Sequence, residues 1–167
     1  MNPDPLKSAL AGQFRAQLKM MRQCIELCPD ELWASGQHPR ALWRIVYHAL
    51  FYTQYYLMPH HEANTPWEKH QNQAVVLWDD DEEGMPPVET TYSREDIIGY
   101  LDQIDGQVVS WLDALDLTSP ESGFPWYKIP KLDHVLVNLR HLGIHLGQVQ
   151  QVLFENGHDP DWTSVVR

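Results

Sequence analysis

Apolar residues recur every three or four positions along four separate stretches of the chain, a spacing that places them on one face of an α-helix. Strand patterns occur only as short scraps between these stretches. The sequence therefore predicts an all-α fold built from four long helices. These helices are expected over residues 5–28, 39–58, 94–116 and 131–156.

Local signals mark the ends of these helices. Asp4 followed by Pro5 is typical of a helix start, since an aspartate caps the first turn and proline is tolerated there. The stretch Ser93–Asp96 resembles a capping box, with Asp96 where Glu or Gln is usual. Gly157 is a natural C-terminal stop. Pro29 and Asp30 are expected to end the first helix, and a short link through Ser35 and Gly36 is expected to lead to Pro39 in the first turn of the second helix.

Two connections are long. Residues 59–92 lack a clean period, and only a short helix is expected there, near 67–77. The acidic run 79–83 is interpreted as a solvated turn, although its carboxylates could bind a hard cation. Residues 116–130 carry three prolines and a glycine, which break both helices and strands. Four helices joined in this way predict a four-helix bundle whose neighbours need not be sequential.

The length and net charge of the chain limit the number of domains and the kinds of partner to be expected. A length of 167 residues suits a single domain, expected over 1–167. A net charge of -11 without a basic cluster argues against nucleic acid and against an anionic membrane surface as partners. No segment has the pattern of a secretion signal or a membrane span, so a cytoplasmic location is expected. Cys24 and Cys28 are interpreted as small buried thiols, with a metal or redox pair as the alternative.

Histidines provide the strongest chemical signal. His141 and His145 lie four residues apart on the fourth helix and therefore share a face. His48 lies on the second helix, which is apolar nearly all the way round and is expected to be buried. If these helices are neighbours, the three imidazoles surround one point. The sequence then predicts a three-histidine metal site.

Such a site has a defined chemistry. Neutral imidazole suits zinc, nickel, copper or iron, and three protein ligands leave a coordination position open. The nucleophile would then be a metal-bound water or thiol, so no side chain is assigned as catalytic. The alternative is a plain bundle with buried, hydrogen-bonded histidines. A metalloprotease of the His-Glu-x-x-His type is excluded, because Leu142 stands where that motif has its glutamate. Candidates for pocket or supporting contacts are Tyr52, Tyr55, His134, Asn138 and Gln148.

The order of these residues resembles the DinB-like superfamily of YfiT-type metal-binding bundles. The resemblance rests on His48 in the second helix, the long connection after it, and His141-x-x-x-His145-x-Gly147-Gln148 in the fourth helix. It implies an up-down-down-up bundle, nickel or zinc bound by the three histidines, and frequent homodimers. Relatives include thiol S-transferases that use a low-molecular-weight thiol, an isomerase and hydrolase-like members. The chain departs from the common pattern at Leu146, where Arg is frequent, and at Thr53, where an acidic residue is frequent.

Two functions follow as expectations. The first is a metal-dependent enzyme, of thiol transferase or hydrolase type, that acts on a small molecule. The second is a non-catalytic dimeric binding or stress-response module with a structural or vestigial metal site. Gly143 and Gly147 bear on the dimer, because small residues on the helix face away from the histidines allow a close approach either by the first helix or by a second subunit.

Overall fold

The structure is a computed structural model that describes residues 4–37, 39–78, 88 and 90–167. The described residues contain helices and turns but no strand, so the predicted all-α class is confirmed. The acidic run 79–83 lies outside the described residues. The elements are α1 (Pro5–Leu27), α2 (Asp30–Trp33), α3 (Leu42–Tyr56), η1 (His61–Ala63), η2 (Asn72–Val75), α4 (Arg94–Ala114) and α5 (Lys131–Glu155).

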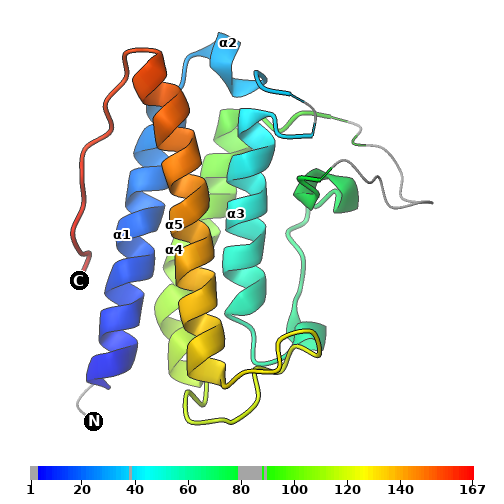
Figure 1. The fold of residues 1–167 in the computed structure, drawn as a ribbon, viewed down its shortest axis with the longest axis vertical. Coiled ribbons are helices and arrows are strands. Elements are labelled where there is room, and N and C mark those ends of the chain that lie inside the picture. Colours follow the sequence, from blue (N-terminus) through cyan, green and yellow to red (C-terminus); the bar gives the residue numbers. More distant parts are fainter. Residues whose placement is uncertain (1–3, 38, 79–87, 89) are drawn as a thin grey trace.

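The four long helices lie side by side (Figure 1). Helix α1 packs against α4 and α5, while α3 packs against α5 and α4. Their apolar faces meet in one core, because each helix has a stripe of large side chains that must be removed from water. Fully buried members of this core include Phe14, Leu18, Leu50, Ile104 and Leu112.

Capping residues mark the starts of α1 and α4 and the end of α5. Asp4 accepts a hydrogen bond from the backbone N–H of Leu6 at 2.9 Å, and Ser93 accepts one from Asp96 at 3.1 Å. The side chain of Asp96 pairs with Lys69 at 2.5 Å, so only half of the expected capping box forms. Gly157 has a φ of 82°, a left-handed conformation that suits the residue after a helix.

The link after α1 differs from the expectation. A one-turn helix, α2, follows Pro29 directly, and its Trp33 is buried and donates its indole N–H to the backbone oxygen of Tyr92 at 2.8 Å. The second long helix begins at Leu42, because Ala41 is still extended. The helix expected over 67–77 is reduced to the four-residue 3₁₀ helix η2.

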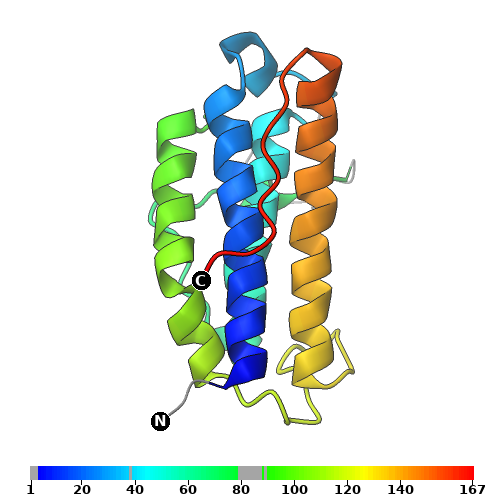
Figure 2. The ribbon, with the colours of Figure 1, turned by 90° about the vertical axis from the view of Figure 1, so that its left-hand side faces the viewer.

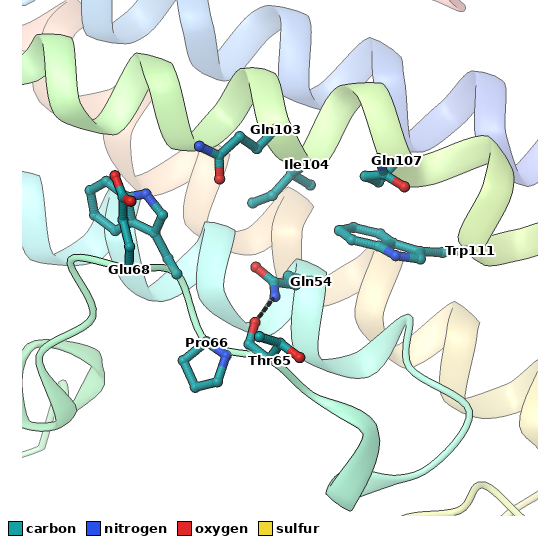
Figure 3. Close-up of a pocket in the computed structure, with 9 residues that line it drawn as sticks. Gln54, Thr65, Pro66, Glu68, Gln103, Ile104, Gln107 and Trp111 are labelled. Carbon is teal, nitrogen blue, oxygen red and sulfur yellow. Dashed lines mark hydrogen bonds between the residues drawn. The ribbon is translucent and has the colours of Figure 1, made fainter.

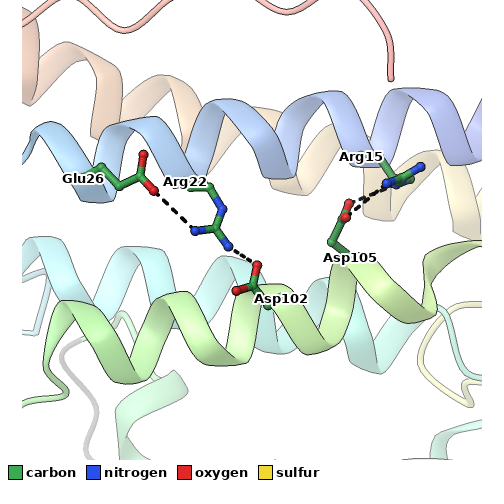
Figure 4. A network of polar contacts seen from close by, with 5 residues as sticks. All are labelled: Arg15, Arg22, Glu26, Asp102 and Asp105. Atoms are coloured by element: carbon green, nitrogen blue, oxygen red, sulfur yellow. Dashed lines mark hydrogen bonds and ion pairs between the residues drawn. The ribbon is translucent and has the colours of Figure 1, made fainter. Parts of the chain in front are cut away.

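Ion pairs join α1 to α4 on the outer surface of the bundle (Figure 4). Arg15 places two guanidinium nitrogens 3.1 and 3.3 Å from the two carboxylate oxygens of Asp105. Arg22 pairs with Asp102 across the helices and with Glu26 at 3.3 Å along α1. These side chains are partly exposed, so each pair contributes about 1 kcal/mol or less.

The C-terminal segment returns along α1 (Figure 2). The N–H of Val166 donates to the backbone oxygen of Gly12 at 3.2 Å. An added Cβ at Gly12 would lie 2.9 Å from Val165, so this glycine permits the close approach.

The two glycines of α5 behave differently. A Cβ at Gly143 would meet Gln17 of α1 at 3.1 Å, whereas a Cβ at Gly147 meets nothing within 4 Å. Gly143 therefore allows a close approach of α1 in the same chain, as the intramolecular alternative predicted.

Two further expectations concern burial and membrane spans. Cys24 and Cys28 are both buried free thiols, and burial raises the pKa of Cys24 to about 12, which fits inert core residues. Among the described residues, no helix has both the length and the apolar character that crossing a bilayer requires.

Candidate metal centre

The packing of α3 against α5 brings the three predicted histidines together. His48 points from the middle of α3 towards His141 and His145, which lie one turn apart on α5. The Nε2 atom of His141 lies 3.0 Å from Nε2 of His48 and 3.1 Å from Nε2 of His145. One nitrogen from each ring lies within 4.8 Å of the other two. We call these three residues the three-histidine centre.

Hydrogen bonds on the far side of two rings fix their orientation. The Nδ1 atom of His48 lies 2.6 Å from the backbone oxygen of Val75, and Nδ1 of His145 lies 2.8 Å from Oε1 of Gln148. Because a carbonyl oxygen only accepts, each Nδ1 carries the ring proton. Each Nε2 therefore directs a lone pair at the shared point. Metal-ligating histidines are held in this way by an acceptor on the second nitrogen.

The surroundings keep the imidazoles neutral. Burial lowers the pKa of His48 to about 3 and that of His141 to about 4. Burial also lowers the pKa of His145, and the nearby positive charge of Arg40 lowers it further. Neutral rings at physiological pH are the form that binds a metal.

Two of the three nitrogen–nitrogen distances are close to those of a metal-binding set. Two imidazole nitrogens bound to one zinc ion at about 2.0–2.1 Å in tetrahedral geometry lie about 3.4 Å apart. The observed separations of 3.0 and 3.1 Å are close to this value. Three neutral nitrogen donors also suit nickel and zinc better than the hard cations, which prefer oxygen. This geometry could hold a divalent metal ion.

No protein-family model matches the chain, and no curated protein matches it either. The function is therefore inferred from the geometry of the centre.

Tyr52 connects the centre to a cavity. Its ring lies 4.7 Å from the ring of His48 and 5.5 Å from that of His141, measured between centroids. Tyr52 and Tyr55 both line a cavity of about 340 Å³ between α3 and the segment 61–78. The side chains around this cavity carry aromatic rings, amides and imidazoles: Phe51, Tyr52, Tyr55, His61, Asn64, His70, Asn72 and Trp78.

The other sequence candidates are distributed around the centre. Gln148 supports His145, as described above. Asn138 is fully buried one turn before His141, and its Nδ2 donates to the backbone oxygen of Thr53 at 3.0 Å. His134 is fully buried one turn earlier, among the rings of Tyr56, Phe124 and Tyr127. It contributes no nitrogen to the three-histidine centre.

The sequence did not reveal that residues 73–76, in the segment between α3 and α4, support the three-histidine centre. Val75 offers only its backbone oxygen to His48, and no side-chain pattern signals that contact. Arg44, which is buried, donates to the backbone oxygens of Gln73 at 2.6 Å and Val76 at 2.7 Å. The detectable signal was the arginine itself, since a guanidinium inside an apolar helix needs buried acceptors.

A separate cavity of about 410 Å³ lies between α3, α4 and the segment 65–68 (Figure 3). Gln54 spans its floor and donates to the backbone oxygen of Thr65 at 2.8 Å, while Trp67 and Trp111 form aromatic walls. This cavity is larger than the one beside Tyr52, and His48, His141 and His145 line neither of the two cavities. The candidate centre is therefore identified by its chemistry and not by volume.

Proposed function

We propose that this protein is a DinB-like metalloenzyme that acts on a small molecule through the three-histidine centre. One observation carries the proposal: the Nε2 atoms of His48 and His145 both lie within hydrogen-bonding distance of His141 Nε2, and acceptors behind His48 and His145 point their lone pairs inwards. The side-by-side packing of four long helices supports the assignment to an up-down-down-up bundle of that superfamily.

A divalent metal bound by the three histidines, nickel or zinc, would act as a Lewis acid that polarises a substrate oxygen or lowers the pKa of a water or thiol. The protein's own residues orient the rings and line the approach. Burial raises the pKa of Tyr55, so its phenol stays protonated and can donate a hydrogen bond to a substrate. Tyr52 lies between the cavity and two of the ligands, where it can contact a bound molecule.

The cavity beside Tyr52 favours an uncharged small substrate. Its described lining offers aromatic faces and neutral hydrogen-bonding groups, with no carboxylate, ammonium or guanidinium group. A charged substrate group would find no opposite charge there to replace its water. A low-molecular-weight thiol as co-substrate and a homodimer remain parts of the proposal that rest on the resemblance.

Elemental analysis tests the centre. Protein purified without a histidine tag and without added metal should contain about one equivalent of nickel or zinc. Each of the variants His48→Ala, His141→Ala and His145→Ala should lose it, while His158→Ala, in the segment after α5, should retain it. An empty wild type that also takes up neither zinc nor nickel on titration would overturn the proposal in favour of a bundle with buried histidines.

The alternative of a structural or vestigial metal site predicts a closed coordination shell. Cobalt-loaded protein distinguishes the two functions, because the visible spectrum of cobalt reports its ligands. A new sulfur-to-cobalt absorption band on addition of a small thiol would show an open position and support the enzyme. An unchanged spectrum over millimolar thiol would favour the non-catalytic module.

A further inference from the structure

His141 differs from the other two members of the three-histidine centre in what faces its second ring nitrogen. His48 and His145 have acceptors for their Nδ1 protons, but Nδ1 of His141 is buried and finds no partner among the described residues. If Nε2 of His141 binds the metal, the ring proton must be on Nδ1. A buried N–H without an acceptor is costly, so native proteins almost always satisfy such a group.

Asn138 presents the complementary problem one turn earlier on α5. It is fully buried, and its Nδ2 donates to the backbone oxygen of Thr53 at 3.0 Å. This contact fixes the amide orientation, because the reverse orientation would set two carbonyl oxygens against each other. Its Oδ1 therefore points elsewhere, and it is buried with no donor among the described residues.

His134 continues the pattern by a further turn. Its side chain is fully buried, and neither ring nitrogen has a hydrogen-bond partner among the described residues. The rings of Phe124 and Tyr56 pack against it at centroid distances of 4.5 and 4.8 Å. Burial lowers its pKa to about 4, so the ring is neutral and has one donor and one acceptor.

These residues form a row, because positions 134, 138 and 141 are spaced by four and three and share one helix face. We call His134, Asn138 and His141 the polar row. With His141 as a ligand, the ring nitrogens and oxygen of the row that lack a partner among the described residues are two N–H donors, on His134 and His141, and two acceptors, on His134 and Asn138. Buried donors and acceptors that lack protein partners are the groups that buried ordered water satisfies.

We propose that the polar row is a buried water-binding site. One ordered water there accepts a hydrogen bond from the Nδ1–H of His141 and donates one to Oδ1 of Asn138, and His134 anchors the end of the row farther from the three-histidine centre. This inference rests on the proposed metal centre. It makes Asn138 a positioning residue for His141, equivalent to Val75 for His48 and Gln148 for His145. Each ligand then has an acceptor of its own.

The test compares zinc affinity among variants that keep the shape of the core. Asn138→Leu removes the acceptor at similar side-chain volume and should weaken zinc binding about 10–100-fold, the usual effect of losing a group that supports a metal ligand. His134→Phe keeps a ring in the aromatic box and should weaken binding by a smaller factor. Val135→Ala is the control, because Val135 is fully buried on the same helix outside the polar row.

Zinc dissociation constants are measured by competition with a chromophoric chelator, and the unfolding of each metal-free variant by urea. Val135→Ala should lower the urea midpoint and leave zinc affinity within about twofold of wild type. If Asn138→Leu also binds zinc within twofold of wild type, Asn138 only braces α3 and the inference is overturned. A wild type that binds no zinc would overturn the metal centre itself, and this inference with it.

A crystal structure of the zinc-loaded wild type gives a second test that does not depend on a variant that folds. An ordered water within about 2.7–3.2 Å of both His141 Nδ1 and Asn138 Oδ1 is expected. Density that shows no atom bridging the two would refute the water site, whatever the affinities of the variants.

Discussion

Mild acid should strongly destabilise the metal-free protein. His48, His134 and His141 have folded-state pKa values of about 3, 4 and 4, against 6.5 for an ordinary histidine. Because these values are lowered, the unfolded chain binds more protons than the folded one as the pH falls below 6.5. The stability that neutral rings provide is therefore present above pH 6.5 and is lost as the pH falls towards 4.

The size of the effect at pH 5 depends mainly on the unfolded chain. Each of the three folded rings is still neutral at pH 5, whereas an unfolded histidine is almost fully protonated. Each ring therefore lowers the free energy of unfolding by about 2 kcal/mol between pH 8 and pH 5, and the three rings together lower it by about 6 kcal/mol. A domain of ordinary stability has only about 5–15 kcal/mol in total.

Urea denaturation of chelator-treated protein at pH 8 and pH 5 measures this loss. The variant His134→Phe should lose about 4 kcal/mol over the same interval, since one of the three rings no longer titrates. A wild-type loss below about 2 kcal/mol would refute the reasoning. So would an identical pH dependence in His134→Phe, because it would mean that His134 is protonated in the folded state.

Three further outcomes are expected. Gln148→Leu removes the acceptor of His145 and should weaken zinc binding about tenfold, a modest loss because water can partly replace this exposed group. The control Gln151→Leu on the same helix should leave zinc affinity unchanged. Equal zinc affinities of the two variants by calorimetry would contradict this prediction. Ile104→Ala empties part of the core and should lower the free energy of unfolding by about 2–5 kcal/mol in guanidinium titrations, a loss that a surface residue would not show. Gly123→Ala should lower the melting temperature in calorimetry, because the φ of Gly123 is 82° and an added Cβ would lie 2.2 Å from the backbone oxygen of Pro59. An unchanged melting temperature would mean that this turn relaxes freely.

The helices were predictable from local signals because each has its own periodic apolar face. The starts of α1 and α4 were also marked by capping residues, whereas α3 has no side-chain cap and begins three residues later than expected. The cap at Asp4 and the stop at Gly157 formed as their residue types indicate. Helix α2 was missed, because four residues after a proline have no period to detect. What orders α2 is tertiary, namely the burial of Trp33 and its hydrogen bond to Tyr92, 59 positions away.

The clustering of the three histidines was predictable, but the groups that support them were not. His141 and His145 share a face through helix geometry alone, and His48 stood out as a polar ring in a buried helix. The acceptor for His48 is a backbone oxygen, which every residue carries, so no residue pattern pointed to Val75. The burial of His134 and Asn138 likewise depends on how closely the 124–127 turn and α3 cover α5.

The hydrogen bond from His48 to Val75 joins the three-histidine centre to the segment between α3 and α4, so the two are linked by thermodynamic reciprocity. If metal binding favours the conformation in which Val75 accepts from His48, any molecule that holds the connection in that conformation raises metal affinity by the same factor. A ligand in the cavity beside Tyr52 would also contact Val75, because Val75 lines that cavity and accepts the hydrogen bond from His48. Occupancy of the cavity and occupancy of the centre are then one coupled equilibrium, and neither affinity is a fixed property of its own site.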